Sequence, residues 1–176
     1  MAAAFVGLTI ACAAHACAAA GANETTVPLG DLATPDPQHP RPAWVASLAA
    51  QPFETQRKEF RRIPLNEQIE FALFRFRDAH PPETRWMKQI REEANPTLAT
   101  SLSSLLRAER SDSLIYDYAR LVQMVAPCLR AQSYELVVTA LRARILRILD
   151  SYDRTVSGLV LDEVQDRHTK GDASCP

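Results

Sequence analysis

The stretch YELVVTALRARILRILDSY, residues 134–152, carries the most regular apolar pattern in the sequence. Its apolar side chains are separated by alternating steps of four and three: Tyr134, Val138, Leu141, Ile145, Ile148 and Tyr152. This spacing places them along one side of an α-helix and forms a heptad seam. Because the seam is short for a free coiled coil, we predict a helix that packs its apolar side against neighbouring helices.

Helical periodicity also extends upstream of this segment. We predict four helices there, at about 66–80, 84–94, 95–108 and 112–126, each bounded by a proline or a capping residue. Residues 159–167 are a candidate for one further short helix, and 43–62 for a short helix that Pro52 interrupts. No segment alternates apolar and polar residues with period two, so no strand is predicted.

The expected fold is therefore all-α, a compact bundle of about five helices. The two helices within 95–126 are joined by the short link AERSD. Links of this length make neighbouring helices antiparallel. The helix at 134–152 is expected to pack against this pair.

Amino-acid composition separates the helical domain from the segments before and after it. Five prolines lie between Pro28 and Pro42, and each fixes φ and biases the residue before it to an extended conformation. We interpret 23–62 as a Pro-rich arm or linker, 63–167 as the helical domain and 168–176 as a polar tail.

Residues 1–22, MAAAFVGLTIACAAHACAAAGA, contain no charged side chain. An apolar run is followed by small residues that offer an A-x-A pattern ending at Ala20 or Ala22, which is typical of a secretory signal peptide. The run is too short and too weakly apolar to span a membrane, so a periplasmic or secreted protein is expected. Since no Lys or Arg precedes the run, a true start further upstream is the alternative.

The positions of the four cysteines also bear on whether the protein is exported. Cleavage at the predicted site leaves Cys128 and Cys175, an even pair that we expect to form a disulfide in an oxidising compartment. The alternative is a lipoprotein with a lipid anchor at Cys12 or Cys17. Neither of these has the larger aliphatic residue that is usual three positions earlier, so soluble export is favoured.

The charge balance excludes some partners. Net charge is -1, from 20 basic and 21 acidic residues, which does not indicate nucleic acid or an anionic membrane as the main partner. The basic residues are mostly Arg, and they are scattered along the sequence. We attribute their number to a compositional bias rather than to an anion-binding cluster.

The stretch DAHPPETRW, residues 78–86, is the strongest candidate for chemistry. It places His80, the only histidine of the predicted domain, between Asp78 and Glu83, where it could act as a general base. However, positions 78 and 80 point to different sides of a helix, and no nucleophile on a tight turn lies nearby. These three residues are therefore weak catalytic candidates.

A structural interpretation accounts for the same stretch. His80 ends one helix, Pro81 and Pro82 turn the chain, Thr84 caps the next helix and Trp86 is its first core residue. Metal and cofactor motifs are also missing: the sequence has no H-x-x-x-H, no C-x-x-C and no glycine-rich phosphate loop. No metal and no cofactor are expected.

Several stretches together resemble small exported bacterial HEAT-like helical proteins. They are IPLNEQIE at 63–70, the DAHPP corner, NPTLATSLSSLLRAERSD at 95–112 and LIYDYARLVQMV at 114–125. The resemblance covers about residues 63–125. It implies a HEAT-like antiparallel helix pair and no particular reaction.

We therefore expect an exported protein-binding module without catalytic activity, with the Pro-rich arm as a tether. A sharper version is an immunity-type inhibitor of an exported toxin. The alternative is a small cell-envelope hydrolase that uses the corner formed by His80 and Glu83. A pocket at His80 with converging polar side chains would favour the hydrolase, whereas an exposed His80 would favour the binding module.

Overall fold

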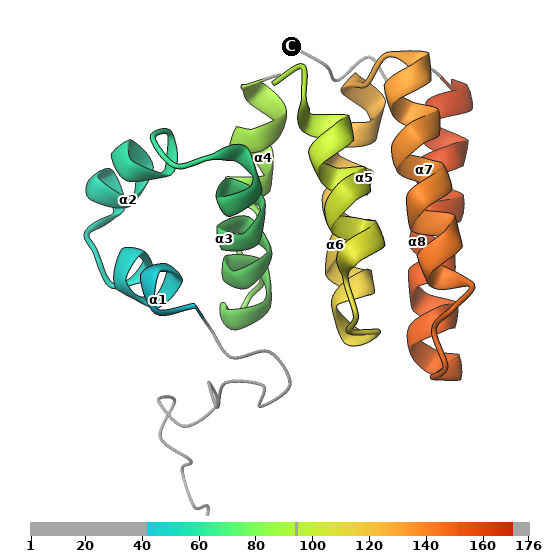
Figure 1. The fold of residues 1–176 in the computed structure, drawn as a ribbon, viewed down its shortest axis with the longest axis horizontal. Coiled ribbons are helices and arrows are strands. Elements are labelled where there is room, and N and C mark those ends of the chain that lie inside the picture. The colour runs from blue at the N-terminus through green and yellow to red at the C-terminus, as the bar shows by residue number, and fades with distance from the viewer. Residues whose placement is uncertain (1–41, 94, 171–176) are drawn as a thin grey trace, which may run out of the picture. The chain divides into compact units, whose positions relative to one another are not determined.

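Every regular element in residues 42–93 and 95–170, the part of the chain that the computed structural model describes, is a helix (Figure 1). This confirms the all-α prediction. The described part holds eight α-helices and one 3₁₀ turn, where about five helices were predicted. Their bounds are α1 Ala43–Ala49, α2 Phe53–Phe60, α3 Leu65–Asp78, α4 Arg85–Glu92, α5 Leu98–Ala108, α6 Ser113–Val125, η1 Ala126–Cys128, α7 Ala131–Ile145 and α8 Ser151–Lys170.

From α3 onward, consecutive helices alternate between two layers. α3, α5 and α7 lie side by side in one layer, and α4, α6 and α8 lie behind them in the other (Figure 1). The most extensive packing joins α5 to α7 and α6 to α8, which are helices two apart in the chain. α7 also packs against α6, so it contacts both helices of the 95–126 pair, as predicted.

α6 is enclosed on several sides because it packs against α3, α4, α7 and α8. Its buried side chains therefore cover more than one side: Ile115, Asp117, Tyr118, Ala119, Leu121, Val122, Gln123 and Val125. Two of these are polar, Asp117 and Gln123. Buried polar groups need partners or a functional reason, and both residues enter the arguments below.

The interpretation of 43–62 as part of a linker is wrong. α1 and α2 lie in this segment, and they bury Val45, Leu48 and Phe60 in the same core as the later helices. Apolar burial of this kind holds a segment to its domain. The remaining part of the predicted arm, residues 23–41, lies outside the described residues.

Prolines begin these helices rather than interrupt them. Pro42, Pro52 and Pro64 directly precede α1, α2 and α3, with φ of -55°, -56° and -56°. The carbonyl oxygen of each accepts a hydrogen bond from a backbone N–H of the first turn. A proline suits this place because its fixed φ is compatible with it and no N–H is required there. Pro52 was predicted to interrupt a helix, whereas it directly precedes α2.

Aromatic side chains join α2, α3 and α4. The ring centroids of Phe60 and Trp86 lie 4.9 Å apart, and those of Phe71 and Trp86 lie 5.1 Å apart. The rings meet at tilted or edge-on angles, which aromatic pairs prefer over face-to-face stacking. All three side chains are buried, which confirms Trp86 as a core residue.

The helix predicted at 134–152 ends earlier than its apolar pattern. α7 stops at Ile145, where hydrogen bonds between residues three apart tighten the chain. Ile148 is nevertheless 0% exposed, whereas Tyr152 is 73% exposed. The seam therefore predicts burial correctly as far as Ile148, although the helix has already ended.

Asp112 holds the connection between α7 and α8 against the start of α6. It directly precedes α6, as predicted for a cap, but its side chain makes no capping hydrogen bond. Its Oδ2 instead accepts a hydrogen bond from the backbone N–H of Leu149 at 3.0 Å, and its Oδ1 lies 3.4 Å from Nη2 of Arg144. One carboxylate thus ties α7 and the connection after it to the start of α6.

The C-terminal helix reaches beyond the predicted end of the domain at residue 167. α8 continues to Lys170, and it includes His168, which was assigned to the polar tail. The ring of His168 stacks on Tyr134 of α7, with centroids 3.6 Å apart and planes 9° apart. The predicted signal peptide and Cys175 lie outside the described residues, so the signal and the disulfide stay predictions.

Candidate functional site

The predicted corner at His80 is a junction between α3 and α4. His80 is exposed just after the end of α3, and Asp78 is the last residue of that helix. The side chain of Glu83 is 9% exposed, and its Oε2 accepts a hydrogen bond from Nε of Arg75 at 2.7 Å. Glu83 also forms an ion pair with Arg85. Its carboxylate is therefore engaged by two guanidinium groups and joins α3 to the start of α4.

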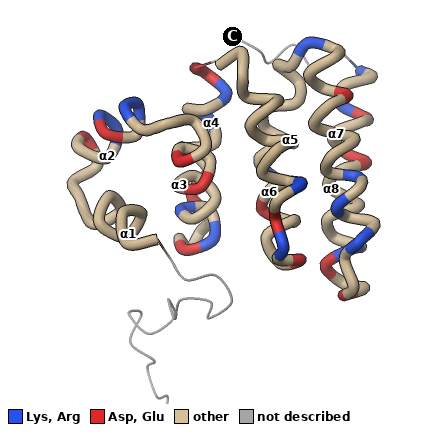
Figure 2. The backbone as a smooth tube through the Cα atoms, viewed as in Figure 1, with Lys and Arg blue, Asp and Glu red and all other residues tan. Residues whose placement is uncertain are grey.

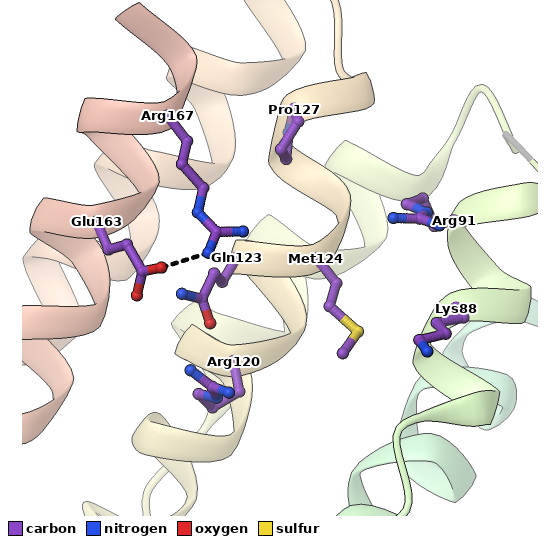
Figure 3. A pocket seen from close by; sticks show the side chains of 8 residues that line it. All are labelled: Lys88, Arg91, Arg120, Gln123, Met124, Pro127, Glu163 and Arg167. Atoms are coloured by element: carbon purple, nitrogen blue, oxygen red, sulfur yellow. Dashed lines mark hydrogen bonds and ion pairs between the residues drawn. The ribbon is translucent and has the colours of Figure 1, made fainter. Parts of the chain in front are cut away.

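A pocket of about 350 Å³ lies over the layer formed by α4, α6 and α8 (Figure 3). This volume falls in the range of about 300–1,000 Å³ that is typical of small-molecule sites. Lys88 and Arg91 come from α4, and Glu163 and Arg167 come from α8. We call this hollow the basic pocket.

α6 lies between α4 and α8 and contributes Arg120, Gln123 and Met124 to the basic pocket. Gln123 and Met124 follow Arg120 by three and four residues, so all three lie on one side of α6. Lys88 and Arg91 are three apart, and Glu163 and Arg167 are four apart, which places each of these pairs on one side of its own helix. Each of the three helices thus contributes residues from one of its sides to the lining of the basic pocket.

Most cations of the basic pocket have no carboxylate partner. Arg167 pairs with Glu163, with Nη2 and Oε1 2.5 Å apart (Figure 3). No ion pair joins Lys88, Arg91 or Arg120 to an acidic side chain within the described residues. Like charges that face one hollow raise its positive potential, because low-dielectric walls focus the field.

Two buried polar groups belong to the same pocket. Nε of Arg91 is buried and has no hydrogen-bond partner. Gln123 is 6% exposed, and no hydrogen bond joins its side chain to another residue of the described part. Of the two, only Nε of Arg91 is a buried atom without a partner, and such atoms are uncommon in folded proteins and call for an explanation such as a ligand or an ordered water.

Large exposed apolar side chains gather elsewhere, in residues 146–159. Leu146, Leu149, Tyr152 and Leu159 are 73%, 88%, 73% and 63% exposed. We call these four residues the apolar patch. The other large exposed hydrophobic side chain of the described part, Phe53, is 42% exposed and has the guanidinium of Arg85 over its ring, 4.7 Å from the centroid.

The apolar patch and the basic pocket meet on one side of α8. Tyr152, Val156 and Leu159 follow one another at steps of four and three, and Glu163 and Arg167 continue with steps of four. Residues with this spacing lie along a single side of a helix. An adjoining side of α8 is buried, at Ser157, Val160, Leu161 and Val164. α8 therefore has apolar residues on two sides, of which only one is covered by the described helices.

Sequence reasoning missed the basic pocket. It took the Arg residues as scattered, and they are indeed spread over several helices (Figure 2). The pocket gathers cations from three segments far apart in the chain, so no local motif marks it. The only sequence signal was the recurrence of polar residues at steps of three or four on the side of each helix away from its apolar seam.

No family model matches the chain, and no curated protein or solved structure is significantly similar to it. Within residues 42–93 and 95–170, no group of three or more His, Cys, Asp and Glu side chains is placed to hold a metal ion. In the same part of the chain, no helix has both the length and the apolar character needed to cross a membrane.

Proposed function

We propose that the chain is an exported, non-enzymatic helical module that binds another protein through the apolar patch. The observation that carries this proposal is the exposure of Leu146, Leu149, Tyr152 and Leu159 in one stretch of the chain. Single exposed apolar side chains are ordinary on protein surfaces. A group of them is typical of a surface that another molecule covers.

The energetics of burial support such a surface. Covering a large apolar side chain contributes about 1.5–3 kcal/mol. Leu149 and Leu159 keep 88% and 63% of their surface exposed, so most of this free energy is available to a partner. The core is already filled at this end by Ile148, which is 0% exposed. The patch is thus not required to complete the core.

Basic side chains border the patch. Arg147 is exposed between Leu146 and Leu149. Arg154 donates hydrogen bonds to the carbonyl oxygen of Ile148, from Nε at 2.9 Å and from Nη2 at 2.5 Å. Interfaces commonly have an apolar centre and a polar rim. Because Asp150, between Leu149 and Tyr152, is exposed as well, a partner with an apolar face and a rim of both charge signs fits this surface best.

Export is the second element of the proposal. It is supported by the signal-like residues 1–22 and by the even pair Cys128 and Cys175 that cleavage leaves. An immunity-type inhibitor of an exported toxin is the sharper form. A toxin gene beside this one would support that form, because such pairs are encoded together.

We also propose that α3 to α8 form three HEAT-like units, of which α3–α4 and α7–α8 pack closely whereas α5 and α6 make little direct contact. The resemblance over residues 63–125 supports this, and so does the alternation of helices between two layers. Helical repeats generally need at least about three units for stability. In such an array the last pair has no following neighbour, which accounts for the uncovered side of α8. The hydrolase alternative gains no support from the corner, since Glu83 is paired with Arg75 and Arg85.

Capture from cell-envelope extract tests the binding function. The full chain, a Leu149→Ser/Leu159→Ser double variant and a Phe53→Ser control are purified from an exporting host, and circular dichroism verifies that each is helical. Phe53 is a suitable control because it is a large exposed apolar side chain outside the patch. We expect one protein to be recovered stoichiometrically by the wild type and the control, and not by the double variant. Equal recovery by all three, or no recovery by the wild type, would contradict the proposal.

A further inference from the structure

We propose that the basic pocket binds a small organic anion that carries at least two carboxylate or phosphate groups. This site is separate from the proposed protein-binding function, because its lining is cationic rather than apolar. Four observations support it: the charge of the lining, the unpaired Nε of Arg91, the volume of the pocket and its two apolar lining residues.

The charge of the lining favours a multivalent anion. Lys88, Arg91, Arg120 and Arg167 contribute four positive charges, and Glu163 contributes the single negative charge. Three of the four cations have no carboxylate partner in the described part of the chain. A ligand with one negative charge would leave most of this charge unbalanced, whereas two or three anionic groups would balance it.

The unpaired Nε of Arg91 favours oxygen acceptors in planar or tetrahedral groups. Nε of Arg91 is buried without a partner. A carboxylate or phosphate that approaches a guanidinium edge-on accepts hydrogen bonds from Nε and one Nη together. Once a rotation of the Arg91 side chain exposes its buried Nε, such a ligand would give that atom the acceptor that the chain does not provide. The amide of Gln123, whose side chain also lines the pocket, would add a donor to the same ligand.

The volume and the floor of the pocket favour an organic frame. About 350 Å³ is more than a single inorganic ion fills, and it matches the lower end of small-molecule sites. Met124 and Pro127 contribute apolar surface between the cations. Met side chains adapt their shape to a ligand because they are unbranched and flexible. A compact hydrocarbon or sugar frame that carries the anionic groups would cover this apolar surface.

Binding would also link parts of the fold. The cations come from α4, α6 and α8, and α6 lies between the other two helices (Figure 3). An anion that contacts all three stabilises the native state in proportion to its occupancy, because the unfolded chain does not hold this arrangement. Ligand binding is therefore expected to raise the melting temperature of the protein.

Isothermal titration calorimetry and thermal unfolding at low ionic strength test the proposal. The probes are citrate, which presents carboxylates, and pyrophosphate, which presents phosphates. Arg120→Gln and Lys88→Gln remove cations from the pocket, and Arg107→Gln makes the same charge change at an exposed position of α5. We expect saturable binding of at least one probe to the wild type. We expect about tenfold weaker binding to each pocket variant and unchanged binding to the control.

The comparison of the two probes shows whether the anionic groups of the ligand are carboxylates or phosphates. Tighter binding of citrate assigns the pocket to carboxylates, and tighter binding of pyrophosphate assigns it to phosphates. Binding should weaken as salt is added, because salt screens the cations. The proposal is overturned if neither probe binds saturably to the wild type, or if Arg107→Gln weakens binding as much as Arg120→Gln does.

Discussion

Arg77 of α3 and Asp117 of α6 form an ion pair that joins the two helical layers. Nη2 and Nε of Arg77 lie 2.7 Å and 3.0 Å from Oδ2 of Asp117. Asp117 is buried and Arg77 is half-buried. Burial raises the pKa of the Asp117 carboxyl above its usual value, while the charge and the hydrogen bonds of Arg77 act in the opposite direction.

Removal of the arginine should destabilise the fold. Arg77→Met keeps the apolar stem but leaves the buried carboxylate of Asp117 without its partner. We expect the free energy of unfolding at pH 7 to fall by about 2 kcal/mol, since an unsatisfied buried charged group is penalised by at least this much. Urea denaturation followed by circular dichroism measures this change. An Arg107→Met control on the exposed side of α5 should change it by less than about 0.5 kcal/mol.

The pH dependence of this variant is a separate prediction. A carboxyl with a raised pKa in the folded state lowers stability as pH rises through that pKa, because the folded state holds the proton more strongly than the unfolded state. Arg77→Met removes the two interactions that lower the pKa of Asp117, so this pKa should rise further. The variant should therefore be less destabilised at pH 4 than at pH 7. An equal loss at both pH values would show that Asp117 does not cause the effect.

Because α2 contributes Phe60 to the core, substitutions in this helix are predicted to change stability. Phe60→Ala opens a cavity beside Trp86 and should lower the free energy of unfolding by about 3–5 kcal/mol, as for other buried aromatic residues. Phe53→Ala, at the other end of α2, should cost less because Phe53 is 42% exposed. Chemical denaturation of both variants measures the difference. If Phe60→Ala were as mild as Phe53→Ala, α2 would not belong to the core.

The fold was predictable where local signals act alone. Thr84 and Asp112 were predicted to cap helices, and α4 and α6 do begin one residue later, although neither side chain makes a capping hydrogen bond. The limits of α1 and α2 were not predicted, because Pro52 has the same local chemistry in a linker as at the start of a helix. The end of α7 was missed because Ile148 continues the apolar seam after the helix stops. Tertiary packing, which the sequence does not display, decides both cases.

The contact between Asp112 and Leu149 can be tested by amide exchange. Asp112→Ala removes the acceptor of the Leu149 N–H, so this amide should exchange faster and the fold should lose about 1 kcal/mol. Asp112→Asn keeps an acceptor oxygen and should retain most of the protection. Hydrogen exchange followed by NMR measures both. Unchanged exchange at Leu149 in Asp112→Ala would show that this hydrogen bond is not formed in solution.

The disulfide between Cys128 and Cys175 is a prediction from the sequence. Mass spectrometry of alkylated protein from an exporting host should find no free thiol before reduction and two after it. Reduction should lower the free energy of unfolding by about 4 kcal/mol, less any strain in the bond, because the bond closes a long loop. Two free thiols in the unreduced mature protein would rule the bond out.

The candidate site was less predictable than the fold. The sequence drew attention to His80 and Glu83, which are close in the chain, but the carboxylate of Glu83 is paired with Arg75 and Arg85. The basic pocket depends on how α4, α6 and α8 lie relative to one another. Exposure of Leu149 and Tyr152 likewise depends on where α7 ends. Such features follow from three-dimensional arrangement and leave no local motif.

Hydrogen–deuterium exchange of the full chain, free and bound to the captured partner, tests the central claim most directly. If the partner covers the apolar patch, exchange should slow in peptides from residues 146–159, and peptides from α1 should be unchanged. The Leu149→Ser/Leu159→Ser variant should show no such protection under the same conditions. Slower exchange elsewhere in the described helices, with residues 146–159 unaffected, would contradict the account.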